Sequence, residues 1–282
     1  MKPSIQSYSK LWRIVFFIAV SATIMSCNDE KLFDPTILTG KSKVYTLNSA
    51  SSAAIRGTIN FTERNDHSTL VTIELDGTTS GNLYPVNIRA NSAAETGDIV
   101  IALNPVDGKT GRSETIVKEK LDGTIITYDE LLVLDAYVIV QQSGNEVAIL
   151  AQSDVGSNET TTTSRMYTLH PVTDSDVSGF VRFTKRVNGN TLIEVNLTGA
   201  SPTGYYPVYI CENSYTIGGP SVINLTPVIG GLGISYSNID QLNNGNYITY
   251  DQLTGYNGHI RVATPESVPK TMALTNIGSN QE

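Results

Sequence analysis

The chain has 282 residues but only two cysteines and three histidines. Two cysteines are too few for a disulfide framework, so the fold has to be stabilised by packing. The three histidines, His67, His170 and His259, provide few general bases and too few imidazoles for a repeated metal centre. Charged residues are also scarce, at 16% against 40% hydrophobic residues, which excludes an intrinsically disordered chain.

Basic residues are outnumbered by acidic ones. Lys2, Lys10 and Arg13 belong to a segment that we expect to be removed, which leaves 16 of the 19 basic residues against 27 acidic ones. The resulting net charge of −11 repels phosphate backbones. The sequence therefore predicts no nucleic-acid partner.

The apolar run Ile14 to Met25 is too short for a permanent membrane span. As a helix it would rise about 18 Å, against about 30 Å of bilayer hydrocarbon. Basic residues precede this run, and Ser26 and Cys27 follow it, an order typical of a signal peptide. The segment Ile24–Cys27 resembles the lipobox of bacterial lipoproteins, with Met25 at an imperfect second position.

The lipobox resemblance implies that residues 1–26 are a signal peptide and that Cys27 is acylated. Several acyl chains, at about 0.8 kcal/mol per buried methylene, would hold the protein permanently on a membrane. The acidic segment Asn28–Glu30 resembles the export tag of some surface lipoproteins, which implies the bacterial outer membrane and its outer face. Residues 27–43 then form a tether, and Cys211 is expected to be an inert thiol without a disulfide partner or a neighbouring histidine. The alternative is an ordinary secretory signal peptide that precedes an incidental cysteine.

The segment Ile126–Leu131 (Ile-Thr-Tyr-Asp-Glu-Leu) returns 122 residues later as Ile248–Leu253 (Ile-Thr-Tyr-Asp-Gln-Leu). The same offset aligns other segments without a gap, among them Gly57 with Gly179, Tyr84–Val86 with Tyr206–Val208, and Gly-Ser-Asn at 156–158 with Gly-Ser-Asn at 278–280. Two copies of one unit explain this pattern. We predict a first domain at 44–158, a polar linker at 159–165 and a second domain at 166–282.

Within each copy the hydrophobic period is two, which is typical of strands. The alternating apolar positions are Val71, Ile73 and Leu75 in the first copy and Ile193, Val195 and Leu197 in the second. Further strands are predicted at 55–62, 84–89, 98–104, 124–128, 136–141 and 147–151, each with a counterpart 122 residues later. Only Tyr128–Leu132 indicates a helical turn. Many short strands separated by Gly, Asn, Asp and Ser predict an all-β protein with two tandem Greek-key, immunoglobulin-like β-sandwiches.

Two parts of each copy resemble the CHRD domain, a family first described in chordin. The segment from Ile126 to Val140 resembles its closing half, and Gly57–Gly77 followed by Tyr84–Arg89 resembles its opening half. The resemblance covers nearly all of the chain after the tether. It implies a β-sandwich distantly similar to copper/zinc superoxide dismutase, in a family without an assigned activity.

The metal-binding histidines that this resemblance would imply are replaced. Their positions hold Tyr84, Asn87, Arg89 and Gln141 in the first copy, and Tyr206, Tyr209, Cys211 and Ala263 in the second. A copper or zinc centre needs several imidazoles that converge on one point. We therefore predict no metal, no cofactor and no enzymatic activity.

Two groups of polar or aromatic residues remain as candidates for a site. The repeated pairs Tyr128-Asp129 and Tyr250-Asp251 are interpreted as structural, with Asp as a helix cap and Tyr as a cover over one end of the domain. Tyr205, Tyr209 and Tyr215 lie within eleven positions of the second copy and form a candidate ligand patch. Alternation with Val208 and Ile210 predicts that Tyr209 faces away from the core. Tyr is also simply common on β-surfaces, which is the structural alternative.

These observations together predict a non-catalytic, lipid-anchored envelope protein that acts by adhesion or by binding a protein or a glycan. Its partners are the membrane, through the anchor, and that ligand. One alternative is a structural spacer of the envelope. Another is a degenerate relative of the dismutases with residual metal chemistry.

Overall fold

The computed structural model describes residues 37–50, 54–144 and 148–281. Within it, Ile37–Glu282 form one compact unit. The predicted signal peptide, Cys27 and most of the predicted tether lie outside the described residues.

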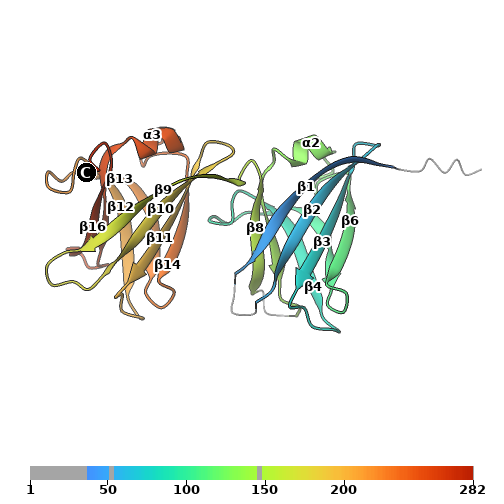
Figure 1. The fold of residues 1–282 in the computed structure, drawn as a ribbon, viewed down its shortest axis with the longest axis horizontal. Helices are drawn as coiled ribbons and strands as arrows, with labels where there is room; N and C mark the ends of the chain where they lie inside the picture. Colours follow the sequence, from blue (N-terminus) through green and yellow to red (C-terminus); the bar gives the residue numbers. More distant parts are fainter. Residues whose placement is uncertain (1–36, 51–53, 145–147, 282) are drawn as a thin grey trace, which may run out of the picture. The chain divides into compact units, whose positions relative to one another are not determined.

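The first copy contains eight strands and one short helix (Figure 1). They are β1 (Leu38–Ser49), β2 (Arg56–Arg64), β3 (Thr69–Asp76), β4 (Leu83–Ala90), β5 (Ile99–Asp107), β6 (Arg112–Val117), α2 (Tyr128–Leu131), β7 (Asp135–Gln141) and β8 (Ile149–Gly156). The second copy contains β9 (Thr160–Pro171), β10 (Ser178–Arg186), β11 (Thr191–Thr198), β12 (Tyr205–Glu212), β13 (Ser221–Ile229), β14 (Ile234–Ile239), α3 (Tyr250–Thr254), β15 (Asn257–Ala263) and β16 (Thr271–Gly278). Every strand of the second copy begins and ends 122 residues after its counterpart, which confirms an all-β chain with two similar domains.

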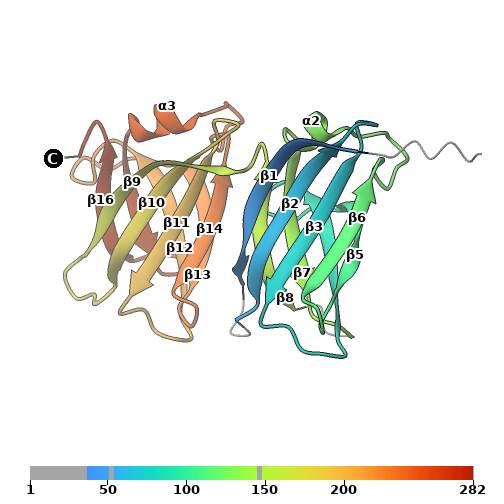
Figure 2. The same ribbon diagram turned by 45° about the vertical axis from the view of Figure 1, so that its right-hand side comes forward.

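The two sheets have the same order of neighbours. The first is a closed barrel in the order β1-β2-β3-β6-β5-β4-β7-β8, and β5 joins β6 only through the pair Asp107 and Arg112. The second runs β13-β12-β15-β16-β9-β10-β11-β14, which is the same cycle opened between the counterparts of β5 and β6. Figures 1 and 2 show the matching position of α2 and α3, each at one end of the strands of its domain.

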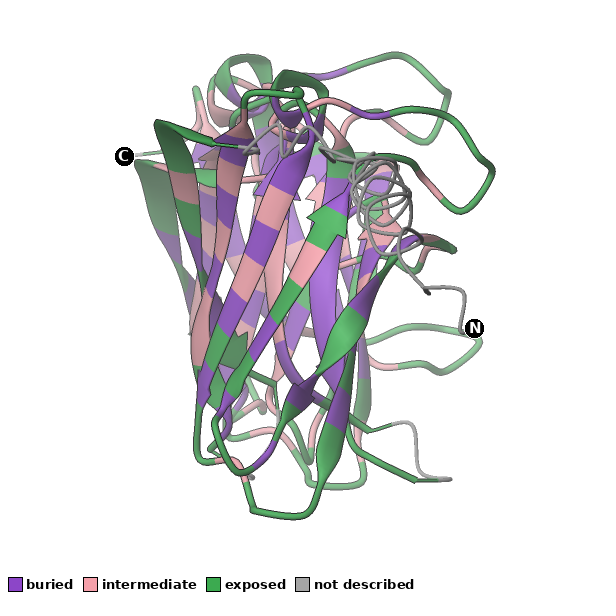
Figure 3. Cartoon of the chain, turned by 90° about the vertical axis from the view of Figure 1, so that its right-hand side faces the viewer, coloured by how far each residue is buried: buried purple, intermediate pink, exposed green. Residues whose placement is uncertain are grey.

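Each domain has its own hydrophobic core. Buried positions alternate with intermediate or exposed ones along the central strands, as the colour bands of Figure 3 show. The core of the first domain contains residues between Tyr45 and Val155, and that of the second contains residues between Tyr167 and Ile277. Among the described residues, no buried residue belongs to both clusters, so the hydrophobic effect stabilises each domain separately.

The sequence predictions for the linker and for the end of the tether are wrong. Residues 160–165 are the first half of β9, and residues 38–43 are the first half of β1. Both segments pair with the next strand of their own domain, for example Arg165 with Phe183. They lack apolar periodicity because most of their side chains are exposed, and the backbone ladder holds them in place.

The prediction of a strand at 124–128 is also wrong. This segment forms one isolated bridge, between Glu119 and Ile125, before α2 begins at Tyr128. The helical turn itself is confirmed. Its cap is Thr127 and not Asp129, because the Thr127 side chain accepts the Glu130 N–H while the Glu130 side chain accepts the Thr127 N–H. Thr249 and Gln252 repeat this capping box in α3.

Candidate functional site

A cleft with a volume of about 700 Å³ lies where the two domains meet. The chain passes there from β8 through residues 157–159 into β9. The first domain supplies side chains of β1, β8 and the loop after β4, and the second supplies Leu192 of β11 with Ile234 and Tyr236 of β14. Clefts between domains are frequent ligand sites.

Most polar groups of the cleft wall carry no charge. They are the side chains of Thr46, Asn48, Ser49, Gln152, Ser153 and Thr160. The two carboxylates of the wall are engaged in ion pairs. Asp154 Oδ2 lies 2.8 Å from Arg186 Nη1, and Glu159 Oε2 lies 2.7 Å from Lys43 Nζ. The cleft therefore offers neutral donors and acceptors together with compensated charges.

Two tyrosines line the cleft in different environments. Tyr45 is buried, and its hydroxyl accepts the Gly156 N–H at 3.3 Å. Burial raises the pKa of Tyr45 to about 12. Tyr236 is 42% exposed, and partial burial followed by the nearby Glu194 carboxylate raises its pKa. Both hydroxyls remain protonated at neutral pH, and the exposed ring of Tyr236 is open to a ligand.

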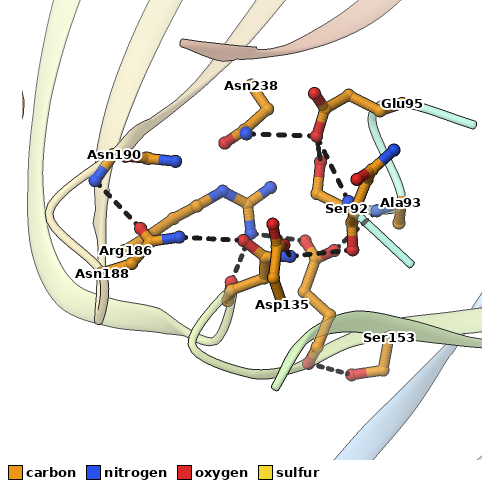
Figure 4. Close-up of polar contacts among 12 residues, drawn as sticks. Ser92, Ala93, Glu95, Asp135, Ser153, Arg186, Asn188, Asn190 and Asn238 are labelled. Carbon is orange, nitrogen blue, oxygen red and sulfur yellow. Dashed lines mark hydrogen bonds and ion pairs between the residues drawn. The ribbon is translucent and has the colours of Figure 1, made fainter. Parts of the chain in front are cut away.

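The domain junction is closed by hydrogen bonds beside the cleft (Figure 4). The Arg186 guanidinium is fully buried and donates from Nη1 to Asp154 and to the Asn158 carbonyl oxygen. Asn188 Nδ2 donates to Asn158 Oδ1 at 3.1 Å. Asn238 Nδ2 also donates to Glu95 Oε2, at 3.1 Å.

The three tyrosines of the predicted ligand patch are not gathered in one place. Tyr205 begins β12 and Tyr215 follows its end, so about 23 Å of strand separates them. Tyr205 and Tyr215 are 49% and 47% exposed. Tyr209 lies between them on the face away from the core, as predicted, with the Arg261 guanidinium 5.2 Å from its ring centre.

Cys211 has a histidine neighbour that the sequence analysis did not find. Cys211 of β12 is paired with His259 of β15, and both side chains are buried. His259 Nδ1 is 2.8 Å from the Asn213 carbonyl oxygen. Burial raises the pKa of the Cys211 thiol, so it remains protonated at neutral pH and is a poor nucleophile. The prediction of an inert thiol therefore rests on burial and not on the absence of a histidine.

The positions where the CHRD resemblance implies histidines carry structural side chains in this fold. The hydroxyls of Tyr84 and Tyr206 accept the Thr79 and Ser201 N–H groups at 2.9 and 2.8 Å. Asn87 Nδ2 donates to Gln141 Oε1 at 3.4 Å. Within residues 37–50, 54–144 and 148–281, no three His, Cys, Asp or Glu side chains are grouped as a metal site would require.

Sequence reasoning missed the junction residues, although a signal for them existed. Asp135 and Asp154 of the first copy are replaced in the second by Asn257 and Asn276, 122 residues later. In the first copy both carboxylates take part in the junction contacts, whereas the second copy has neutral amides at these positions.

No protein-family model, curated protein or solved structure matches this chain. In the part of the chain that the structure describes, no helix is both long and apolar enough to span a bilayer.

Proposed function

We propose that this chain is a non-catalytic, lipid-anchored protein of the bacterial outer membrane that binds a glycan in the cleft between two CHRD-like β-sandwich domains. The anchor on Cys27 is supported by the lipobox resemblance, and the surface location by the resemblance of Asn28–Glu30 to an export tag. The glycan assignment follows from the cleft.

The observation that carries this proposal is the lining of the cleft. A sugar presents hydroxyl groups at its edge and C–H groups on its face. The sugar hydroxyls can form hydrogen bonds with the amides of Asn48 and Gln152 and with the hydroxyls of Ser153 and Thr160. The half-exposed Tyr236 and the side chain of Ile234 can pack on the C–H groups of the sugar face. A highly charged ligand is a poorer match, because the charges of Asp154 and Glu159 are already paired.

The proposal is tested on a soluble fragment that begins at residue 37, so that β1 is complete. A glycan array selects a ligand, and isothermal titration calorimetry then measures its affinity. We expect Tyr236→Ala to weaken binding up to about tenfold, because one aromatic contact contributes about 0.5–1.5 kcal/mol and about 1.4 kcal/mol is a factor of ten in affinity.

Two control variants separate the cleft from other surfaces. Tyr247→Ala removes a tyrosine that is 84% exposed and lies outside the cleft wall, and should leave the affinity unchanged. Tyr205→Ala and Tyr215→Ala test the patch predicted from the sequence. Loss of binding in either of these, with full binding in Tyr236→Ala, would refute the cleft as the site. A fragment that binds no glycan would refute the proposed function and favour a structural spacer.

A further inference from the structure

Arg186 connects the two domains through a buried side chain. It is the last residue of β10, and none of its surface is exposed. A buried guanidinium is unfavourable unless acceptors of good geometry surround it. The acceptors here belong to the other domain: the Asp154 carboxylate, at 2.8 Å, and the Asn158 carbonyl oxygen.

The acceptors of Arg186 are also held by hydrogen bonds within the first domain. We define the junction socket as Asp135, Asp154 and Asn158. Asp154 Oδ1 accepts the Ala93 N–H at 2.7 Å, which leaves Oδ2 for the arginine. Asn158 Nδ2 donates to Asp135 Oδ1 and to the Asn91 carbonyl oxygen, so the residue that receives Arg186 is fixed by its own side chain (Figure 4).

The second copy shows what the socket looks like where no arginine enters it. The counterparts of Asp135, Asp154 and Asn158 are Asn257, Asn276 and Asn280. Their local geometry is kept: Asn276 Oδ1 accepts the Tyr215 N–H at 3.0 Å, and Asn280 Nδ2 donates to Asn257 Oδ1 at 2.7 Å. Backbone support therefore needs only amides at these positions. The carboxylates occur in the copy that receives a cation.

The socket also shapes the cleft. Asp154 lies in the cleft wall, and the opposite wall with Leu192, Ile234 and Tyr236 belongs to the domain that carries Arg186. The distance between the walls therefore depends on the orientation of the domains. Because the cores share no residue, polar contacts and the short connection through residues 157–159 have to set that orientation.

Both side-chain hydrogen bonds that Arg186 donates come from one nitrogen, Nη1. Arg186 Nε and Nη2 are buried without a protein acceptor among the described residues, and Asn238 Oδ1 is buried without a protein donor among them. The contacts of Nη1 therefore provide the specific attraction, and removal of the Asp154 charge should be enough to release it.

From these contacts we propose that Arg186 is a positioning residue that fixes the orientation of the two domains through the junction socket and thereby gives the cleft its shape. The part that concerns ligand affinity rests on the proposed function. The part that concerns domain orientation does not.

The test measures the distance between the domains in the full chain by double electron–electron resonance. Spin labels are placed on Lys109→Cys and Asn244→Cys, two exposed positions in different domains, in a background with Cys27→Ser and Cys211→Ser. The parent chain should give one narrow distance distribution. Arg186→Leu and the nearly isosteric Asp154→Asn should both broaden it, while circular dichroism shows that the strands remain.

The repeat supplies matched controls. Arg64 is the counterpart of Arg186, and Asn276 that of Asp154. Arg64→Leu and Asn276→Ala should leave the distribution narrow. A narrow distribution in both Arg186→Leu and Asp154→Asn would overturn the proposal, as would equal broadening in the controls. If a glycan ligand has been found, the two junction variants should also weaken its binding. Broadening in these variants supports the proposal even when no glycan binds.

Discussion

At the scale of single residues, Gly156 shows why a glycine recurs at the end of each copy. Its φ is +62°, and an added Cβ would lie 2.1 Å from the Leu134 carbonyl oxygen. Gly156 lies in the turn that places Asn158 beside Asp135 in the junction socket. We expect Gly156→Ala to lower the free energy of unfolding by at least about 1–3 kcal/mol, measured by urea denaturation.

Gly189→Ala is the control for this substitution. Gly189 also has a positive φ, +89°, but an added Cβ would meet no atom within 4 Å. The free energy of unfolding of Gly189→Ala should fall by only about 1–2 kcal/mol, which is the cost of the left-handed backbone conformation for alanine. Equal losses in the two variants would mean that the close approach to Leu134 is relieved by a backbone shift.

At the scale of elements, α2 and α3 form a pair that differs in one ionisable group. The Glu130 carboxylate accepts the Thr127 N–H at 2.8 Å, and this hydrogen bond holds the pKa of Glu130 below its usual value. The neutral Gln252 makes the same bond at 2.9 Å in α3. Because the folded pKa of Glu130 is lowered, its stabilisation is present above the unfolded pKa of about 4.3 and is lost as the pH falls through the folded value.

We therefore expect Glu130→Gln to make the first domain less sensitive to acid below about pH 4. Hydrogen exchange of the α2 amides, measured between pH 3 and pH 7 at matched intrinsic rates, follows the change. The α3 amides serve as the internal reference. An unchanged pH dependence in Glu130→Gln would show that other carboxylates control this end of the domain.

The elements that the sequence predicted are those whose side chains alternate in burial. Val71, Ile73 and Leu75 are all buried in β3, and their pattern alone identified the strand. Residues 160–165 form a strand with few buried side chains, so periodicity could not reveal them. Residues 124–128 have strand-forming composition, but the Thr127 cap begins a helix there.

At the scale of the whole molecule, the repeat gave the number of domains and the matching of their elements. It could not give the cleft, because a cleft between domains depends on their orientation and not on the pattern within either one. Nor could it show how far apart the three tyrosines of the predicted patch lie, because residues close in sequence are spread along a strand at about 3.3 Å per residue. Charged residues of the first copy with uncharged counterparts, such as Asp135/Asn257 and Asp154/Asn276, were the sequence trace of the junction.

Separate cores also predict separate unfolding. Phe61 and Phe183 are counterparts, both fully buried, and each ring packs on a tyrosine, at centroid distances of 5.4 Å from Tyr45 and 5.0 Å from Tyr167. Phe61→Ala should destabilise the first domain by about 3–5 kcal/mol, and Phe183→Ala the second by a similar amount. Hydrogen–deuterium exchange with mass spectrometry assigns the loss of protection to a domain.

Each variant is the control for the other. Because the junction contributes polar contacts and no shared core, the domain without the substitution should keep nearly all of its protection. Loss of protection in both domains of either variant would show that the junction couples their unfolding. In that case Arg186 and the junction socket would contribute to folding stability as well as to orientation, and Asp154→Asn should then restore independent unfolding.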